Sequence, residues 1–176
     1  MKKELFIVLH NIRSAYNVGS IFRTADGIGV SSIYLTGYTP CPLSLRSSVA
    51  GGPLGSNNKP LYLTRAHKMI AKTALGAEEN VSWEKIKSLG KLIEKLKSQR
   101  VKIVAIEQDK KSVGYKNFRL SFPMALIVGN ELRGVNEKIL AKCDKIVEIP
   151  MRGKKKSLNV SVAFGIVGYE ITSKLK

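Results

Sequence analysis

A chain of 176 residues is long enough to bury a hydrophobic core and is expected to form one domain, residues 1–176. Its 30 Lys and Arg residues outnumber its 13 Asp and Glu residues, giving a formal net charge of +17 and a pI near 10. This excess favours a polyanionic partner, above all nucleic acid, with an anionic membrane as the weaker alternative. No stretch reaches the roughly 20 apolar residues of a membrane span, so no membrane-spanning helix is expected.

The N-terminal segment predicts a buried strand from Leu5 to Leu9. Together with the preceding Met1-Lys2-Lys3, this apolar run is similar to the start of a signal peptide. It stops at His10, however, and is shorter than the roughly 7–15 apolar residues that a signal peptide needs. The strand is therefore the better interpretation.

The cysteine and histidine content argues against disulfide and metal sites. Cys41 and Cys143 are too few for a disulfide framework, which predicts a reducing, cytoplasmic environment. His10 and His67 lie far from each other and from the cysteines in the sequence. No structural zinc site, and no other metal, is therefore expected.

The segment after the first strand predicts an amphipathic helix with Asn17 as its N-cap and Gly29 at its C-terminal end. Apolar residues at spacings of three, four and seven form one face of this helix. Gly19, Arg23 and Asp26 are expected on the opposite face. The apolar stripe consists of Val18, Ile21, Phe22, Ala25 and Ile28.

A second strand is predicted from Ser32 to Gly37, followed by a long irregular loop over residues 38–60. The loop is rich in Pro, Gly, Ser and Asn and has little periodicity. Loops of this length are usually functional or disordered, so an RNA-contacting flap and a floppy insertion fit equally well. Arg46 and Lys59 in the loop, and Arg65 just after it, are candidates for RNA contacts.

The second half of the chain predicts alternating helices and strands, which implies an α/β protein with a mainly parallel sheet flanked by helices. A helix from Trp83 to Arg100 would place its lysines outward, a pattern more typical of solvation than of binding. Its inward residues would be Ile86, Leu89, Ile93 and Leu96, and its outward residues Lys85, Lys87, Lys91, Lys95 and Lys97. The elements expected after it are strands Val101–Ile106, Pro123–Val128 and Ile146–Ile149 and helices Asn136–Ala141 and Ser157–Lys174.

The common nucleotide-binding motifs do not fit. Gly129 and Gly134 have the spacing of a P-loop, but Val135-Asn136 stand where Lys and Ser or Thr are required. No GxGxxG motif follows a predicted strand either. These observations disfavour kinase-like proteins, ATPases and ordinary Rossmann dehydrogenases.

Three loop-to-helix segments, residues 17–23, 129–134 and 157–159, each place Asn beside Ser, Arg or Glu. Loops at the carboxyl ends of parallel strands meet at the edge of the sheet where α/β proteins bind ligands. The three segments therefore predict one composite active site.

Each polar residue of these segments also has an ordinary structural interpretation. Arg23 could bind a phosphate near the positive end of its helix or pair with Asp26, and its spacing alone favours the pair. Glu131 could form a salt bridge or cap a turn. Ser157 and Asn159 could be helix N-caps.

Taken together, the segments resemble the three ordered motifs of the SpoU/TrmH-type RNA 2′-O-ribose methyltransferases of the SPOUT superfamily. Motif 1 is similar to residues 11–30, NIRSAYNVGSIFRTADGIGV. Motif 2 is similar to residues 126–135, LIVGNELRGV, and motif 3 to residues 149–151 and 157–163, IPM and SLNVSVA. The order and separation of the motifs match as well, and the likeness covers nearly the whole chain.

This resemblance implies a deep trefoil knot at the C-terminal end of the sheet, a rare exception to unthreaded topology. It also implies that S-adenosylmethionine binds the knot loops. Main-chain groups there would read the adenine edge, while aliphatic side chains enclose the ring. By position, the cofactor-binding residues are Val128, Gly129, Asn130, Ile149, Pro150, Met151, Ser157, Leu158 and Val160.

The implied reaction is transfer of the sulfonium methyl group to a ribose 2′-hydroxyl, which requires no metal. The resemblance makes Arg23 catalytic, with Asn17, Glu131, Ser157 and Asn159 around it. Because an arginine side chain stays protonated in proteins, we expect Arg23 to clamp the adjacent RNA phosphate and stabilise the developing alkoxide. A phosphate oxygen or water would take the proton, and Glu131 would orient Arg23 or hold the substrate.

The resemblance also implies a homodimer whose active site joins two subunits. Gly165 and Gly168 on the last helix would permit close helix packing. The chain is expected to lack the extra N-terminal RNA-binding domain of some relatives, so its own basic surface would hold the RNA, which favours tRNA over rRNA. Residues Lys154, Lys155 and Lys156 join the candidates for RNA contacts.

Two alternatives remain open. A non-catalytic RNA-binding protein would keep the charge but need not keep Arg23, Glu131 and Asn159 together. A knotted methyltransferase that acts on a base would share the fold and the cofactor. The Arg of motif 1 and the Asn-Glu of motif 2 favour ribose.

Overall fold

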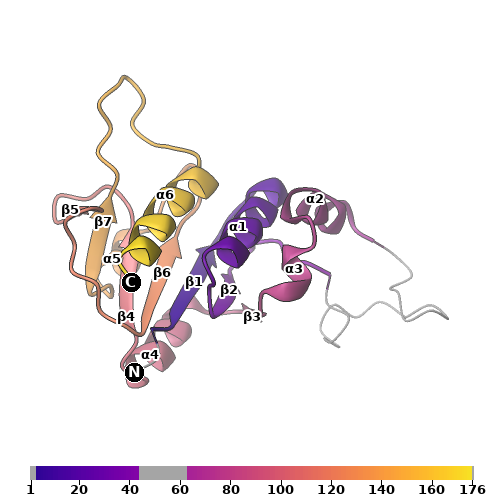
Figure 1. The fold of residues 1–176 in the computed structure, drawn as a ribbon, viewed down its shortest axis with the longest axis horizontal. Helices are drawn as coiled ribbons and strands as arrows, with labels where there is room; N and C mark the ends of the chain where they lie inside the picture. Colours follow the sequence, from indigo (N-terminus) through magenta and orange to yellow (C-terminus); the bar gives the residue numbers. More distant parts are fainter. Residues whose placement is uncertain (1–2, 44–62, 176) are drawn as a thin grey trace.

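A computed structural model describes residues 3–43 and 63–175 and contains a seven-stranded sheet (Figure 1). The strands are β1 (Leu5–His10), β2 (Ser32–Thr36), β3 (Trp83–Ile86), β4 (Lys102–Ile106), β5 (Val113–Gly114), β6 (Met124–Val128) and β7 (Lys145–Glu148). Their order across the sheet is β3-β2-β1-β6-β4-β7-β5, and every neighbouring pair is parallel. The predicted α/β class with a parallel sheet is confirmed.

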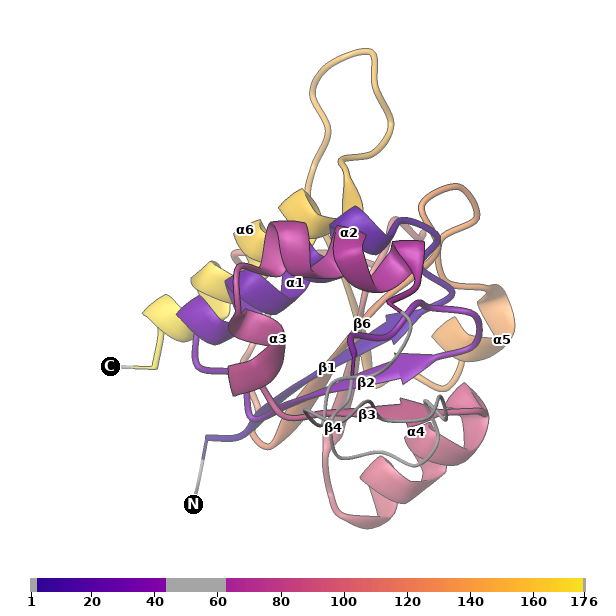
Figure 2. The same cartoon turned by 90° about the vertical axis from the view of Figure 1, so that its right-hand side faces the viewer.

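Helices cover both faces of this sheet. They are α1 (Ala15–Gly27), α2 (Arg65–Ala74), α3 (Ala77–Asn80), α4 (Leu89–Ser98), α5 (Glu137–Leu140) and α6 (Val160–Ser173). Figures 1 and 2 show α1, α2 and α6 over one face and α4 on the other. Successive strand residues enter opposite cores: Ile7 and Leu9 pack with α1, whereas Val8 packs with α4.

The first helix begins three residues earlier than predicted. Ser14, not Asn17, is the N-cap, and its hydroxyl oxygen accepts a hydrogen bond from the Asn17 backbone N–H at 3.3 Å. The predicted C-terminal end is confirmed. Gly29 has φ +71°, and the Val30 N–H reaches back to the Ala25 carbonyl at 3.0 Å, the bonding of a glycine-terminated helix.

Gly19 is buried, contrary to the prediction that it lies opposite the apolar face of α1. The helix α2 crosses α1 at this point. A Cβ on Gly19 would lie 2.1 Å from Thr73 Oγ1 and 2.3 Å from the Ile70 carbonyl oxygen. The prediction was wrong because the helical periodicity of α1 cannot show that a second helix covers its other side.

The predicted helix from Trp83 to Arg100 was wrong over its first turn. Residues Trp83–Ile86 form β3, which pairs in parallel with β2, and α4 starts only after its N-cap Ser88. Sheet pairing here overrides local helix propensity. Lys85 is exposed as predicted, but on a strand and not on a helix, and its amine donates to the carbonyl oxygens of Gly37, at 2.8 Å, and Thr39.

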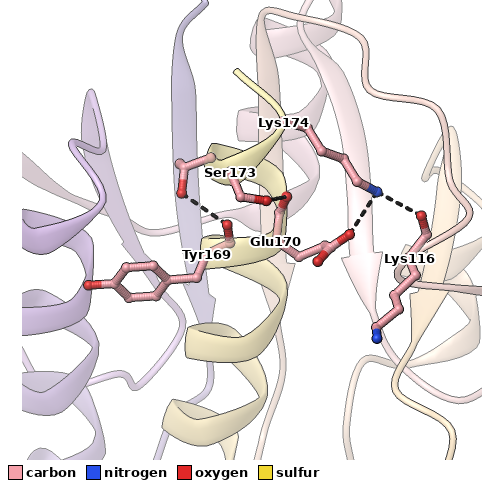
Figure 3. Close-up of polar contacts among 6 residues, drawn as sticks. Lys116, Tyr169, Glu170, Ser173 and Lys174 are labelled. Carbon is pink, nitrogen blue, oxygen red and sulfur yellow. Dashed lines mark hydrogen bonds and ion pairs between the residues drawn. The ribbon is translucent and has the colours of Figure 1, made fainter. Parts of the chain in front are cut away.

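The last helix begins at Val160 with Asn159 as its N-cap, so Ser157 precedes the helix and does not cap it. Gly168 allows close packing within the chain, because a Cβ there would lie 2.8 Å from Ile28 Cδ1 on the loop after α1. Figure 3 shows how the end of α6 is fastened: Lys174 Nζ bonds the Glu170 carboxylate at 2.8 Å and the Lys116 carbonyl at 2.7 Å.

Parallel pairing directs the carboxyl ends of all these strands to one edge of the sheet. The segments that leave β1, β6, β4 and β7 there contain motif 1, motif 2, residues 107–112 and motif 3. The long loop between β7 and α6 projects from this edge (Figures 1 and 2). The fold thus places the three motifs together, although they are up to 142 residues apart in the sequence.

Candidate active site

Glu131, in the loop after β6, holds the start of α1. Its Oε2 accepts the Arg13 backbone N–H at 2.9 Å, and its Oε1 accepts the Ser14 N–H and the Asn17 Nδ2, both at 3.0 Å. Burial by itself raises the pKa of this carboxyl, but the hydrogen bonds outweigh burial and hold the pKa below its usual value. Glu131 therefore acts as a cap, as one of its two ordinary interpretations anticipated.

Asn159 connects motif 3 to the start of α1. Its Nδ2 donates to Asn17 Oδ1 at 3.1 Å, while its Oδ1 caps α6 by accepting the Ser161 N–H at 2.8 Å. Asn17 thus donates to Glu131 with one end of its amide and accepts from Asn159 with the other. We call Glu131, Asn17 and Asn159 the loop network. It joins all three motifs, so the prediction that they meet is confirmed.

Asn130 shapes the motif 2 loop from the inside. Its Oδ1 accepts the backbone N–H groups of Leu132, at 3.0 Å, and Arg133, at 2.9 Å. Its Nδ2 donates to the Asn11 carbonyl at 3.0 Å and to the Tyr38 hydroxyl at 2.9 Å. This side chain, which is 7% exposed, therefore fixes the loop and also ties it to motif 1.

Glycine is required at both ends of the motif 2 loop. A Cβ on Gly129 would lie 2.4 Å from the backbone carbon of Gly134. Gly134 has φ +62°, and a Cβ there would lie 2.0 Å from Glu107 Oε2. The spacing that is similar to a P-loop thus reflects a tight loop closed on itself and not a phosphate cradle.

A cavity of about 270 Å³ lies beside the loop network, between the motif 2 loop and the segment that joins β7 to α6. Its apolar wall combines aliphatic side chains from the ends of three strands with residues at the start of α6. Of the nine predicted cofactor-binding residues, Pro150 does not line it. The other eight do: Val128, Gly129, Asn130, Ile149, Met151, Ser157, Leu158 and Val160.

Charge in this cavity runs against the charge of the whole chain. Among the described residues that line it, Glu107, Glu131 and Glu148 are acidic and Arg133 alone is basic. The chain as a whole carries +17. A locally acidic cavity in a basic protein suits a ligand that carries positive charge.

Two lining residues, Glu107 and Gln108, were missed by the sequence interpretation. The Glu107 carboxylate accepts the backbone N–H of Val135 and that of Gln108, both at 2.9 Å. Gln108 Nε2 donates to the Lys156 carbonyl at 2.6 Å. The pair therefore fastens the motif 2 loop and the approach to Ser157. The available signal was a polar pair at the end of a strand, similar to Asn130-Glu131 one residue after β6.

Arg23 stands apart from the loop network. An α-helix turns by about 100° per residue, so Arg23 projects about 120° around α1 from Asn17. Its side chain is exposed and makes no hydrogen bond or ion pair with any residue that the structure describes. The interpretation of Arg23 as a surface partner of Asp26 was therefore wrong. None of the residues predicted around it, Asn17, Glu131 and Asn159, forms a hydrogen bond or ion pair with Arg23.

The candidate RNA-binding residues are spread over several segments. Lys154, Lys155 and Lys156 are exposed in the projecting loop between β7 and α6, and Arg65 is exposed at the first residue of α2. Arg46 and Lys59 lie outside the described residues, as does most of the predicted loop 38–60.

Within residues 3–43 and 63–175, no group of three or more His, Cys, Asp or Glu side chains could hold a metal ion. In the same part of the chain, no helix is long and apolar enough to cross a membrane.

Residues 58–169 match the SpoU rRNA Methylase family, and the chain therefore belongs to this family of RNA methylases. One relative is the TrmH family protein YacO of Bacillus subtilis, which is 27% identical over 98% of this chain and 60% of its own. The chain thus spans about three fifths of the length of the curated relatives that it matches.

Solved structures share the fold. The TrmH/SpoU tRNA modifying enzyme of A. aeolicus is 29% identical, with a TM-score of 0.76 over 98% of this chain and 76% of that chain. The AdoMet-bound rRNA methyltransferase of Sinorhizobium meliloti has the same TM-score at 24% identity, over 100% of this chain and 58% of that chain.

Proposed function

We propose that this protein is an S-adenosylmethionine-dependent methyltransferase that modifies a ribose 2′-hydroxyl of RNA, with tRNA favoured over rRNA. The observation that carries the proposal is the convergence of three motifs at the loop network, directly beside the cavity. The family membership of the chain supports the reaction class.

The residues around the cavity fit S-adenosylmethionine. Ile106, Val128, Ile149, Leu158 and Val160 offer an aliphatic enclosure for an adenine ring, and the Gly129–Gly134 loop brings backbone groups to the same space. The acidic lining suits the positive charge of a sulfonium ion. When bound, the cofactor supplies an electrophilic methyl group, so the chain itself needs to provide only alignment and help with a proton.

We assign Arg23 to binding of the RNA nucleotide that receives the methyl group. Its guanidinium has no partner among the described residues, so its planar fork is free for an RNA phosphate. Bound there, it would hold the nucleotide and stabilise negative charge that develops on the 2′-oxygen. The proton would pass to a phosphate oxygen or to water, because a guanidinium is not a base at neutral pH.

The loop network has a different assignment. Glu131, Asn17 and Asn159 use their polar atoms on one another and on backbone groups, which fixes the loops around the cavity. Of the five predicted catalytic residues, Ser157 is the other one available to meet a substrate, because it is exposed and lines the cavity. Glu131 therefore acts on the substrate through the loops that it holds and not through Arg23.

The proposal includes the family's architecture. Residues 1–176 would fold as one domain, with a trefoil knot formed by the segments from β6 to α6, and would act as a homodimer. The exposed apolar side chains Tyr16 on α1, and Val162 and Tyr169 on α6, support an interface on this face of the sheet.

Calorimetric titration with S-adenosylmethionine in metal-free buffer tests the cofactor assignment, and binding is expected without added metal. Incubation of the protein with cellular tRNA and rRNA then tests the reaction. A 2′-O-methyl group blocks alkaline cleavage at the neighbouring phosphodiester, so a new resistant site identifies the product. Binding of RNA without methyl transfer would favour the non-catalytic alternative, and a methylated base would exclude ribose as the target.

A further inference from the structure

The turn after β2 holds an aromatic side chain exposed beside the loop network. Tyr38 lies at the centre of this turn and is 59% exposed, which is unusual for a large aromatic side chain. The turn itself is firmly held. Thr39 Oγ1 donates to the Leu9 carbonyl at 3.0 Å, and the Lys85 amine binds the carbonyl oxygens on either side of Tyr38.

The backbone of Tyr38 is held from the side of motif 1 as well. Its N–H donates to Asn11 Oδ1 at 3.2 Å. Gly37 has φ +62°, and a Cβ there would lie 1.9 Å from the same Asn11 oxygen. Asn11 in turn bonds His10 Nε2 at 3.0 Å, and burial lowers the pKa of His10, which favours its neutral ring. The turn is thus built around Asn11.

The far end of the Tyr38 side chain is also fixed, because its hydroxyl accepts a hydrogen bond from Asn130 Nδ2 at 2.9 Å. Asn130 precedes Glu131 of the loop network and lines the cavity. Backbone and hydroxyl are therefore both anchored, while the ring between them remains open to solvent. A ring held in this way loses little conformational freedom when a ligand covers it.

We propose that the Tyr38 ring is a stacking platform for a nucleobase of the RNA substrate. Aromatic rings bind unpaired bases through their faces, and this requires no hydrogen-bond code. The inference rests on the RNA substrate of the proposed function. It adds that a base is held on the motif 1 side of Asn130, outside the cavity, so that its ribose lies next to the loop network.

A nucleobase fits this position better than a protein partner. Protein docking surfaces are contiguous apolar patches, whereas Tyr38 is a single ring framed by the polar groups of Asn11 and Asn130. The exposed Arg13, two residues after Asn11, and the net charge of +17 suit a phosphate backbone beside the base.

The test measures binding of a short, unstructured RNA that carries the fluorescent base 2-aminopurine, whose emission falls when it stacks. Tyr38→Ala should weaken binding roughly 5- to 150-fold and abolish the fluorescence change. The salt dependence of binding should stay the same, because no charge is removed. Tyr38→Leu, which keeps an apolar side chain, should bind as weakly, whereas Tyr38→Phe should stay within about threefold of the parent.

Leu75→Ala is the control, since Leu75 is another apolar side chain that is exposed (66%) and lies at the C-terminal end of α2. It should bind the RNA as the parent does. Unchanged binding by Tyr38→Ala, equal loss in Tyr38→Phe, or equal loss in Leu75→Ala would each overturn the stacking site.

The same variants separate this inference from the proposed function. If the parent binds RNA through Tyr38 but neither binds S-adenosylmethionine nor methylates, the stacking site stands and the proposed function fails. If the parent methylates RNA and Tyr38→Ala has an unchanged KM, the proposed function stands and the stacking site fails. A parent that binds no RNA would overturn both.

Discussion

The loop network and Arg23 belong to the same predicted site but differ in how their polar atoms are used. Glu131 accepts three hydrogen bonds, and Asn17 and Asn159 bond to each other. Arg23 has no hydrogen bond or ion pair among the described residues. The difference separates residues that build the site from a residue that is free to meet a ligand.

The largest effect is expected at the free residue. Arg23→Ala should lower the rate of methyl transfer by at least roughly 100- to 1,000-fold, the usual cost of losing a group that stabilises charge in the transition state. Affinity for S-adenosylmethionine should stay nearly unchanged, because Arg23 does not line the cavity. Single-turnover methylation and calorimetry on the same variant measure the two quantities.

Two further variants sharpen this result. Arg23→Lys should also fail, since an ammonium cannot reproduce a bidentate fork. Arg119→Ala, which removes another exposed arginine from the loop before β6, should leave the rate unchanged. Near-normal turnover by Arg23→Ala would reduce Arg23 to an ordinary surface residue.

An intermediate effect is expected in the loop network. Glu131→Gln replaces one acceptor oxygen by an NH2 group, which cannot accept a hydrogen bond from the backbone or Asn17 N–H groups that face it. The free energy of unfolding at pH 7 should therefore fall by about 1–3 kcal/mol. Because the folded-state pKa of Glu131 lies below its usual value, its stabilisation is present above the unfolded pKa and is lost as the pH falls through the folded pKa. The gap between parent and variant should therefore shrink on acidification.

Chemical denaturation from pH 7 down to pH 3 measures this gap. Glu84→Gln on the exposed strand β3 is the matched control, and the stability of this variant should follow that of the parent across the same pH range. A gap that stayed constant across this range would show that the charge of Glu131 does not hold the loops.

The smallest effect is expected at the basic loop. Replacing Lys154, Lys155 and Lys156 by Gln should reduce the slope of log affinity for tRNA against log salt by roughly 0.7–0.9 for each phosphate that is no longer neutralised. The same charge change on α4, through the exposed Lys91, Lys95 and Lys97, is the control and should leave the slope unchanged. An unchanged slope in the loop variant would place the RNA elsewhere.

Local sequence patterns determined the parts of this fold that depend on neighbouring residues. Apolar runs marked β1, β4, β6 and β7, and Gly29 marked the end of α1 by its left-handed backbone. The pattern at 83–86 was ambiguous in isolation, because the apolar residues of so short a segment fit one face of a helix as well as one face of an edge strand. Only the exposed edge of β2 made them a strand.

The site divides along the same line. The sequence by itself predicted which three loops meet beside the cavity, since Asn beside Ser, Arg or Glu in a loop-to-helix segment is a local signal. Only the tertiary structure decided that Asn17 bonds both Glu131 and Asn159, and that Glu107 and Gln108 fasten the cavity. Hydrogen bonds between residues more than a hundred positions apart depend on how parallel strands are ordered, and no local periodicity encodes that order.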